Sequence, residues 1–177
     1  MWLKQVIIIF TLCFLSACQS QTPLKTVDYV DIQRFMGDWY VIANIPTFLE
    51  KNAYNPKESY FLDADGSIAT TFSFNAGSLE GEQKIYYPRG FIKNTQTNAE
   101  WGMQFIWPIK ADYRIVYLDS NYQYTVIGRN KRDYVWIMAR KPKISEQKLS
   151  ELTEFVASLG YDINQLELAT HKLPLNQ

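Results

Sequence analysis

Short runs in which apolar and polar side chains alternate recur along the body of this chain, and they limit its possible folds more than any other feature. Turn-forming residues bound the runs, as at Asp63-Ala64-Asp65-Gly66. Alternation with a period of two is typical of strands that bury one face. Eight runs are expected to form strands, at 38–45, 58–62, 67–74, 83–93, 100–107, 112–118, 123–128 and 133–140.

The links between these runs are short, and no helical pattern interrupts the series. Neighbouring strands are therefore expected to pair antiparallel, because parallel strands need long crossover connections. Eight such strands suit a closed up-and-down barrel, which leaves no free sheet edge; a sandwich is the structural alternative. The predicted fold is all-β, an eight-stranded antiparallel up-and-down β-barrel with one C-terminal α-helix.

The predicted helix follows Pro142. Ser145 is its expected N-cap, Glu146 lies at its positive end, and Gly160 ends it. Its apolar residues recur at helical spacing, which predicts one buried stripe packed on the barrel wall: Leu149, Leu152, Phe155, Val156 and Leu159. A short turn over 31–36 is expected to close one barrel end, and 165–169 to form a last short strand.

The N-terminus reads as a secretory signal: Lys4 precedes an apolar run from Val6 to Leu15, which is too short to span a bilayer. The sequence Leu15-Ser16-Ala17-Cys18 resembles the lipobox of bacterial lipoproteins, where the cysteine is acylated and becomes residue one. The alternative is an ordinary signal peptide with a chance cysteine. We therefore expect a signal peptide at 1–17, a lipidated polar tether at 18–27 and one domain at 28–177. In lipoproteins, Gln19 in place of aspartate after the cysteine implies the outer membrane, with lipidated Cys18 as the membrane attachment.

Composition excludes several functional classes. The chain carries 18 basic and 18 acidic residues, so no nucleic-acid footprint is expected. After loss of Cys13 and acylation of Cys18, the domain would keep no thiol, and His171 is its single histidine. We therefore expect no metal site, cofactor or catalytic pair. The scattered carboxylates fit solvated strand ends: Glu50, Glu58, Glu80 and Glu82.

One face of the predicted sheet is rich in aromatic side chains. Alternation places five groups on it: Trp39, Val41 and Ala43; Ile68, Thr70, Phe72 and Phe74; Trp101, Met103, Phe105 and Trp107; Tyr113, Ile115 and Tyr117; and Tyr134, Trp136 and Met138. The interior of an eight-stranded barrel is either filled by side chains or holds one small ligand. The residues leave both readings open.

Three motifs resemble those of the lipocalin family, in the family's order. They are Gly37-Asp38-Trp39-Tyr40, the block from Tyr113 to Asp119 with Tyr122 after it, and Trp136-Ile137-Met138-Ala139-Arg140. The resemblance implies a lipocalin (calycin) fold in which Trp39 closes the barrel base and Arg140 packs across its indole face. It implies structural roles for the motif residues, namely Gly37, Trp39, Asp119, Tyr122 and Arg140.

Among lipocalins the chain is most similar to the bacterial outer-membrane lipoprotein branch, which implies a fatty acid, a lysophospholipid or a related lipid as ligand. The expected ligand-binding residues are Val41, Ala43, Tyr60, Thr70, Phe72, Met103, Phe105, Tyr113, Ile115, Tyr134 and Trp136. The loop 46–56 would border the mouth, where Phe48, Leu49 and Tyr54 either cap the pocket, touch a membrane or cover the barrel. A filled, structural module and a lipid-modifying enzyme are the alternatives to a carrier. The oligomeric state is not predicted.

Overall fold

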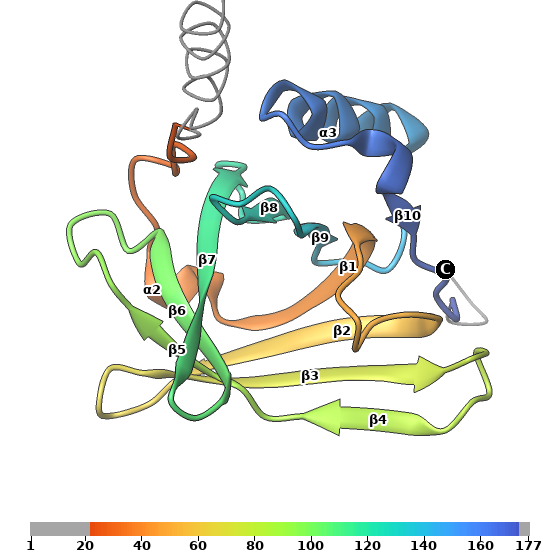
Figure 1. Ribbon diagram of the computed structural model, residues 1–177, viewed down its shortest axis with the longest axis horizontal. Coiled ribbons are helices and arrows are strands. Elements are labelled where there is room, and N and C mark those ends of the chain that lie inside the picture. Colours follow the sequence, from red (N-terminus) through yellow and green to blue (C-terminus); the bar gives the residue numbers. More distant parts are fainter. Residues whose placement is uncertain (1–21, 174–177) are drawn as a thin grey trace, which may run out of the picture.

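The computed structural model describes residues 22–173, so the predicted signal peptide and Cys18 lie outside the described residues. A closed antiparallel barrel dominates this part of the chain (Figure 1). Its strands are β1 (Gly37–Ile45), β2 (Ala53–Leu62), β3 (Ile68–Ala76), β4 (Gln83–Tyr86), β5 (Arg89–Ile92), β6 (Glu100–Ile106), β7 (Ile109–Leu118), β8 (Tyr124–Gly128) and β9 (Val135–Ala139). The outlying elements are α2 (Ile32–Phe35), α3 (Glu146–Ser158), η1 (Ile163–Gln165) and β10 (Glu167–Leu168).

The strands pair in the predicted neighbour-to-neighbour order. The barrel closes because β1 pairs with both β2 and β9, and β10 adds to β1 on the outside. The run predicted as one strand at 83–93 is divided into β4 and β5, since Pro88 has no amide hydrogen to donate. Strand β2 begins earlier than predicted, at Ala53, which shortens the expected loop 46–56 to 46–52.

The barrel has two unlike ends. The short helix α2, capped by Asp31, lies at the end where β1 begins, and we call this the closed end. Strand order and register place four connections at the opposite, open end: the loop 46–52, the β3–β4 turn, the β6–β7 turn and the β8–β9 turn. The predicted turn over 31–36 is confirmed as the cover of one end.

Two hydrophobic clusters stabilise the fold. An inner cluster fills the closed half of the barrel around Phe35, Trp39 and Trp101. An outer cluster lies between the barrel wall and α3, where Leu152 and Val156 are fully buried (Figure 1). The predicted helix is confirmed, with the Ser145 side chain accepting a hydrogen bond from the Lys148 amide.

Irregular pairing corrects two predictions about the inward face. The register of β1 against β9 shifts between Val41 and Ala43, so Ala43 packs in the outer cluster while Val41 stays inside. A similar shift after Ile115 turns Tyr117 outward, where its ring lies 5.4 Å from that of Phe155. Each extra residue at a bulge reverses the alternation that follows it.

The chain before the barrel is docked on its wall. The sequence predicted a polar tether through Val27, yet Leu24 is buried in the outer cluster and the Val27 amide donates to Ile115 O at 3.0 Å. The Leu24 amide donates to Asn130 Oδ1 at 2.8 Å. Burial of one leucine and these hydrogen bonds hold 22–27 against the protein.

Candidate functional site

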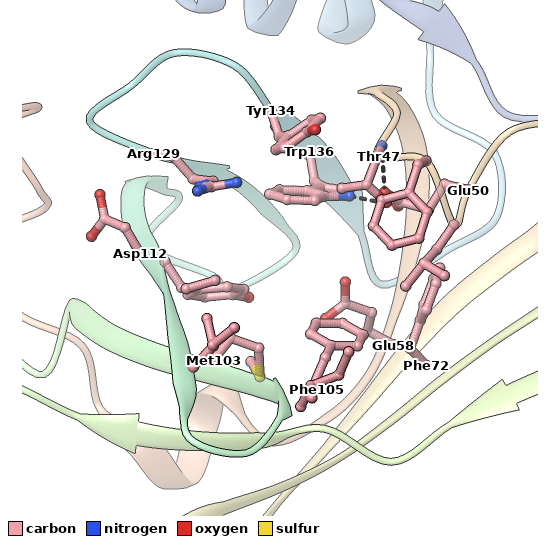
Figure 2. A pocket seen from close by; sticks show the side chains of 16 residues that line it. Thr47, Glu50, Glu58, Phe72, Met103, Phe105, Asp112, Arg129, Tyr134 and Trp136 are labelled. Carbon is pink, nitrogen blue, oxygen red and sulfur yellow. Dashed lines mark hydrogen bonds between the residues drawn. The ribbon is translucent and has the colours of Figure 1, made fainter.

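A cavity of about 240 Å³ occupies the open half of the barrel. Figure 2 shows the side chains that line it. Side chains from the barrel strands and from two open-end loops converge on it. Its lining is mostly aliphatic and aromatic, as in sites for small apolar molecules. The lining residues are Thr47, Phe48, Leu49, Glu50, Glu58, Phe72, Met103, Phe105, Ile106, Ile109, Ala111, Asp112, Tyr113, Arg129, Tyr134 and Trp136.

The structure places the sequence-predicted binding residues in three locations. Those in the cavity wall are Phe72, Met103, Phe105, Tyr113, Tyr134 and Trp136. Those buried inside the barrel but outside this wall are Val41, Tyr60, Thr70 and Ile115. Ala43 lies on the outer wall, beneath α3.

Three polar side chains form a connected group at the inner end of the cavity. The Tyr60 hydroxyl donates to Glu58 Oε2, and the Tyr60 and Tyr113 hydroxyls are 2.7 Å apart. Burial in this apolar setting raises the pKa of Glu58 to about 7, and the charge of Glu50 adds to the effect. Burial also holds the pKa of both tyrosines well above its ordinary value. The group therefore offers a carboxyl that is largely neutral below pH 7 and about half ionised near pH 7.

Glu50 fastens the loop 46–52 to the cavity wall. Its Oε1 accepts from Trp136 Nε1 at 2.7 Å, and its Oε2 accepts from the Thr47 amide at 2.9 Å (Figure 2). Asn44 Nδ2 donates to the same carboxylate at 3.3 Å. Charge-assisted hydrogen bonds of this kind are among the stronger ones, so the loop and the Trp136 indole are held in one arrangement.

Arg129 is the cation of the cavity wall, and Figure 2 shows its side chain directed toward Trp136. Its Nη1 lies 3.5 Å from Asp133 Oδ2, while its buried Nε has no hydrogen-bond partner among the described residues. Asp112, next to it in the wall, accepts from the Asn130 amide at 2.8 Å. The cavity wall thus has polar groups in two places, at Glu58 and at Arg129 with Asp112, and is otherwise mostly apolar.

Sequence reasoning missed several lining residues, Glu58 and Glu50 above all, and the expectation that both are solvated is wrong. Glu58 lies two positions before Tyr60 and so shares its inward face, a signal that alternation already carried. Glu50 lies in a loop without periodicity, and only the folded chain brings it to Trp136. Arg129 lies just after β8, where inward direction depends on the neighbouring turn, and Asp112 lies within β7, which begins three residues earlier than predicted.

At the closed end, Arg140 packs across the Trp39 indole, with its guanidinium carbon 3.8 Å from the ring centroid. This contact confirms the prediction. The Trp39 Nε1 donates to Phe35 O at 2.9 Å. Asp119 accepts from the Gln123 and Tyr124 amides, both at 2.6 Å. These contacts organise the closed end, far from the cavity.

The Gly37 and Tyr122 positions belong to the same end. Gly37 has φ +91°, a backbone conformation that favours glycine. The Tyr122 hydroxyl accepts from the Asp31 amide at 2.9 Å, which ties the β7–β8 turn to the start of α2. All five motif residues therefore lie around the closed end.

A family model described as a lipocalin-like domain matches residues 30–171. The chain belongs to the lipocalin family. Temperature-induced lipocalin-1 of Arabidopsis thaliana is 31% identical over 163 residues, covering 85% of this chain and 82% of that protein. Outer membrane lipoprotein Blc of Citrobacter freundii is 28% identical over 153 residues, covering 85% and 86%.

Solved lipocalin structures share the fold. Insecticyanin from the tobacco hornworm Manduca sexta superimposes with a TM-score of 0.65 at 14% identity, covering 87% of this chain and 86% of that chain. Lobster apocrustacyanin A1 gives 0.64 at 11% identity, covering 89% and 94%. Lipocalins bind small hydrophobic ligands, and the cavity of this lipocalin lies within the matched region.

Within residues 22–173, no helix is both long enough and apolar enough to cross a bilayer. No group of three or more histidine, cysteine, aspartate or glutamate side chains in the same residues is arranged to hold a metal ion.

Proposed function

We propose that this lipocalin binds a fatty acid, a lysophospholipid or a related lipid in its cavity and acts at the outer membrane, anchored through acylated Cys18. The apolar cavity at the open end is the observation that carries the proposal. Each Å² of apolar ligand surface removed from water contributes about 25 cal/mol, so burial of one acyl chain drives association. The role is binding and storage or transport, with no chemical step.

The shape of the cavity suggests how such a ligand lies. A volume of about 240 Å³ is below the roughly 300–1,000 Å³ of sites that enclose a drug-sized ligand. It therefore suits part of an acyl chain, with the rest directed through the mouth. An anionic head group would not be placed beside Glu58, because burial already disfavours negative charge there and an ionised Glu58 would repel a second anion. Arg129, nearer the open end, is the better partner for an anionic head group.

The alternatives from the sequence are less well supported. A structural module with a filled barrel is disfavoured by the open cavity, since Trp107 lies exposed outside it and Trp101 lies below it in the inner cluster. For an enzyme, the single histidine is poorly placed: His171 Nε2 lies 2.7 Å from Val41 O, and its ring packs edge-on against Tyr40, outside the cavity lining.

The binding proposal is tested by filling the cavity. Ala111→Trp adds an indole to the cavity wall, while Ala157→Trp adds one to the exposed face of α3 as the matched control. Titration with a fluorescent fatty acid and with a lysophospholipid should saturate in the wild type and the control, and weaken at least about tenfold in Ala111→Trp, which loses contacts worth more than 1.4 kcal/mol. Equal affinity in all three proteins, or no saturable binding in the wild type, would contradict the proposal.

The anchor is tested separately, in cells fed labelled palmitate. Cys18→Ala should abolish both acylation and membrane fractionation, because the thiol is the proposed site of acylation. The chain supplies its own control, since Cys13→Ala removes the other cysteine and should leave both unchanged. Incorporation of labelled palmitate into Cys18→Ala, or no incorporation into the wild type, would contradict the proposed lipid anchor at Cys18.

A further inference from the structure

Large apolar side chains surround the mouth of the cavity and face water. Trp107 is 82% exposed, Phe48 76%, Ile106 69% and Ile109 68%. They come from the loop 46–52 and the β6–β7 turn, two segments far apart in the sequence. Exposed apolar side chains gathered in one place mark an interaction surface more often than scattered ones do. We call these four residues the rim.

The rim belongs to the cavity mouth and not to another face. Phe48, Ile106 and Ile109 line the outer part of the cavity, and Trp107 lies between the last two in the turn. A lipid that enters or leaves the cavity therefore passes beside these side chains.

The N-terminal segment reaches the structure at this same end. Arg132, in the β8–β9 turn, donates from Nη2 to Thr22 O at 2.9 Å. This turn borders the mouth, because Arg129 and Tyr134 on either side of Arg132 line the cavity. From Thr22 the chain runs along the outside of the barrel wall, where Leu24 is buried. It then reaches the closed end, where the Val30 amide donates to Thr97 O.

Chain length then limits where an anchor at Cys18 can be. Cys18 precedes Thr22 by four residues, and four residues at full extension span at most about 14 Å. A lipid on Cys18 therefore lies within about 14 Å of a residue fixed at the mouth end. A bilayer that takes up this lipid therefore lies nearer the open end of the barrel than the closed end.

We propose that the rim docks on the lipid bilayer, so that the cavity opens directly onto the membrane that holds the anchor. The inference rests on the proposed acylation of Cys18, which supplies the short attachment. Tryptophan is enriched at membrane interfaces, and Trp107 is the rim's most exposed side chain. In this orientation the ligand exchanges between bilayer and cavity without crossing bulk water.

Trp107 is a suitable probe. Trp2 precedes the proposed acylation site and would be removed with the signal peptide, Trp39 and Trp101 are fully buried, and Trp136 lies in the cavity wall. The full acylated chain is reconstituted in vesicles of phosphatidylcholine with or without bromine on its acyl chains, since bromine quenches tryptophan within contact range. Brominated lipid should quench the wild type, and Trp107→Phe should lose most of that quenching. Phe61→Ser, which changes an exposed aromatic on the wall of β2, is the matched control and should keep it.

The outcomes separate this inference from the proposed function. Flotation of the wild type and of Cys18→Ala with vesicles reports the anchor, and fatty-acid titration in solution reports the cavity. If the anchored chain binds fatty acid but Trp107→Phe is quenched as strongly as the wild type, membrane docking is wrong. If brominated lipid does not quench the protein and cross-linking detects dimers on the vesicles, the rim contacts a second copy of the chain. That outcome would also overturn membrane docking. Trp107-dependent quenching without fatty-acid binding would leave docking standing and overturn the carrier.

Discussion

The Arg140 guanidinium joins the separate segments of the closed end. It donates to Arg34 O and Asp38 O, both at 2.8 Å, and to Phe35 O at 3.1 Å, while lying over the Trp39 indole. Its Nε donates to Tyr122 O at 3.2 Å. One rigid fork thus satisfies carbonyls at the end of α2, the start of β1 and the β7–β8 turn.

Arg140→Ala should lower the free energy of unfolding by about 3 kcal/mol, because several charge-assisted hydrogen bonds and the stacking are lost together. Arg140→Lys should recover only part of this loss, since an ammonium cannot reproduce the planar fork. Denaturant unfolding of both proteins, with exposed Lys141→Ala as control, measures the effect. Fatty-acid binding by the folded fraction should persist. Wild-type stability in Arg140→Ala would show that the carbonyls find other partners.

Glu58 makes stability depend on pH. Its pKa rises from about 4.5 to about 7 on folding, chiefly through burial. The folded state therefore holds the proton more tightly than the unfolded state, and the carboxyl's contribution is full below pH 4.5 and is lost as pH rises through 7. At about 1.4 kcal/mol per pKa unit, the loss is at most about 3.5 kcal/mol.

Glu58→Gln removes this titration and keeps the shape of the side chain. Its stability relative to the wild type should therefore increase between pH 5 and pH 8. Denaturant unfolding at both pH values measures the change, and Glu80→Gln on the exposed surface is the control. A difference between Glu58→Gln and the wild type that stays constant with pH would mean that Glu58 titrates as a solvated carboxyl.

At the scale of elements, α3 covers the barrel from outside and contributes stability rather than cavity wall. Leu152 is fully buried between the helix and the strands, and α3 supplies no cavity residue. Leu152→Ala should lower the free energy of unfolding by about 2–5 kcal/mol through lost burial and the space left behind. Exposed Gln147→Ala is the control, with unfolding curves for stability and fatty-acid titration for the cavity. A large loss of affinity in folded Leu152→Ala would show that the helix shapes the interior.

The order and pairing of the elements followed from the sequence because they depend on local patterns: alternation, turn residues and the Ser145 cap. The inward direction of Ala43 did not, because the bulge after Val41 arises from pairing with β9, a partner about a hundred residues away. The division of the 83–93 run shows a signal that was present but not used, since Pro88 marks the break between β4 and β5.

At the scale of the whole molecule, the barrel is filled at one end and open at the other. Alternation identified the aromatic face but not the height of each residue along the barrel axis, so it could not separate Trp101 in the inner cluster from Trp136 in the cavity wall. Height depends on strand register and tilt, which are properties of the closed sheet. The cavity could therefore be expected from the family resemblance, whereas its polar group at Glu58 required the structure.

The same polar group links ligand binding to protons. Glu58 contacts the Tyr60 hydroxyl, which in turn contacts that of Tyr113. Glu50 lies on the loop beside it, and Arg129 and Asp112 lie in the same cavity wall. An acyl chain that fills the cavity removes water from the Glu58 carboxyl, which disfavours its charged form and raises its pKa above 7. Binding should then take up a proton, so affinity should fall as pH rises from 6 to 8, by up to about tenfold per unit above the pKa of the free protein.

An uncharged monoacylglycerol is the ligand of choice for testing this linkage, because its own charge does not change with pH. Titrations at pH 6, 7 and 8 measure how the affinity depends on pH. Glu58→Gln should bind with equal affinity at all three values; a slope that survives in this variant would assign the proton to another group, and a flat wild-type profile would show that Glu58 keeps its water when the cavity is occupied.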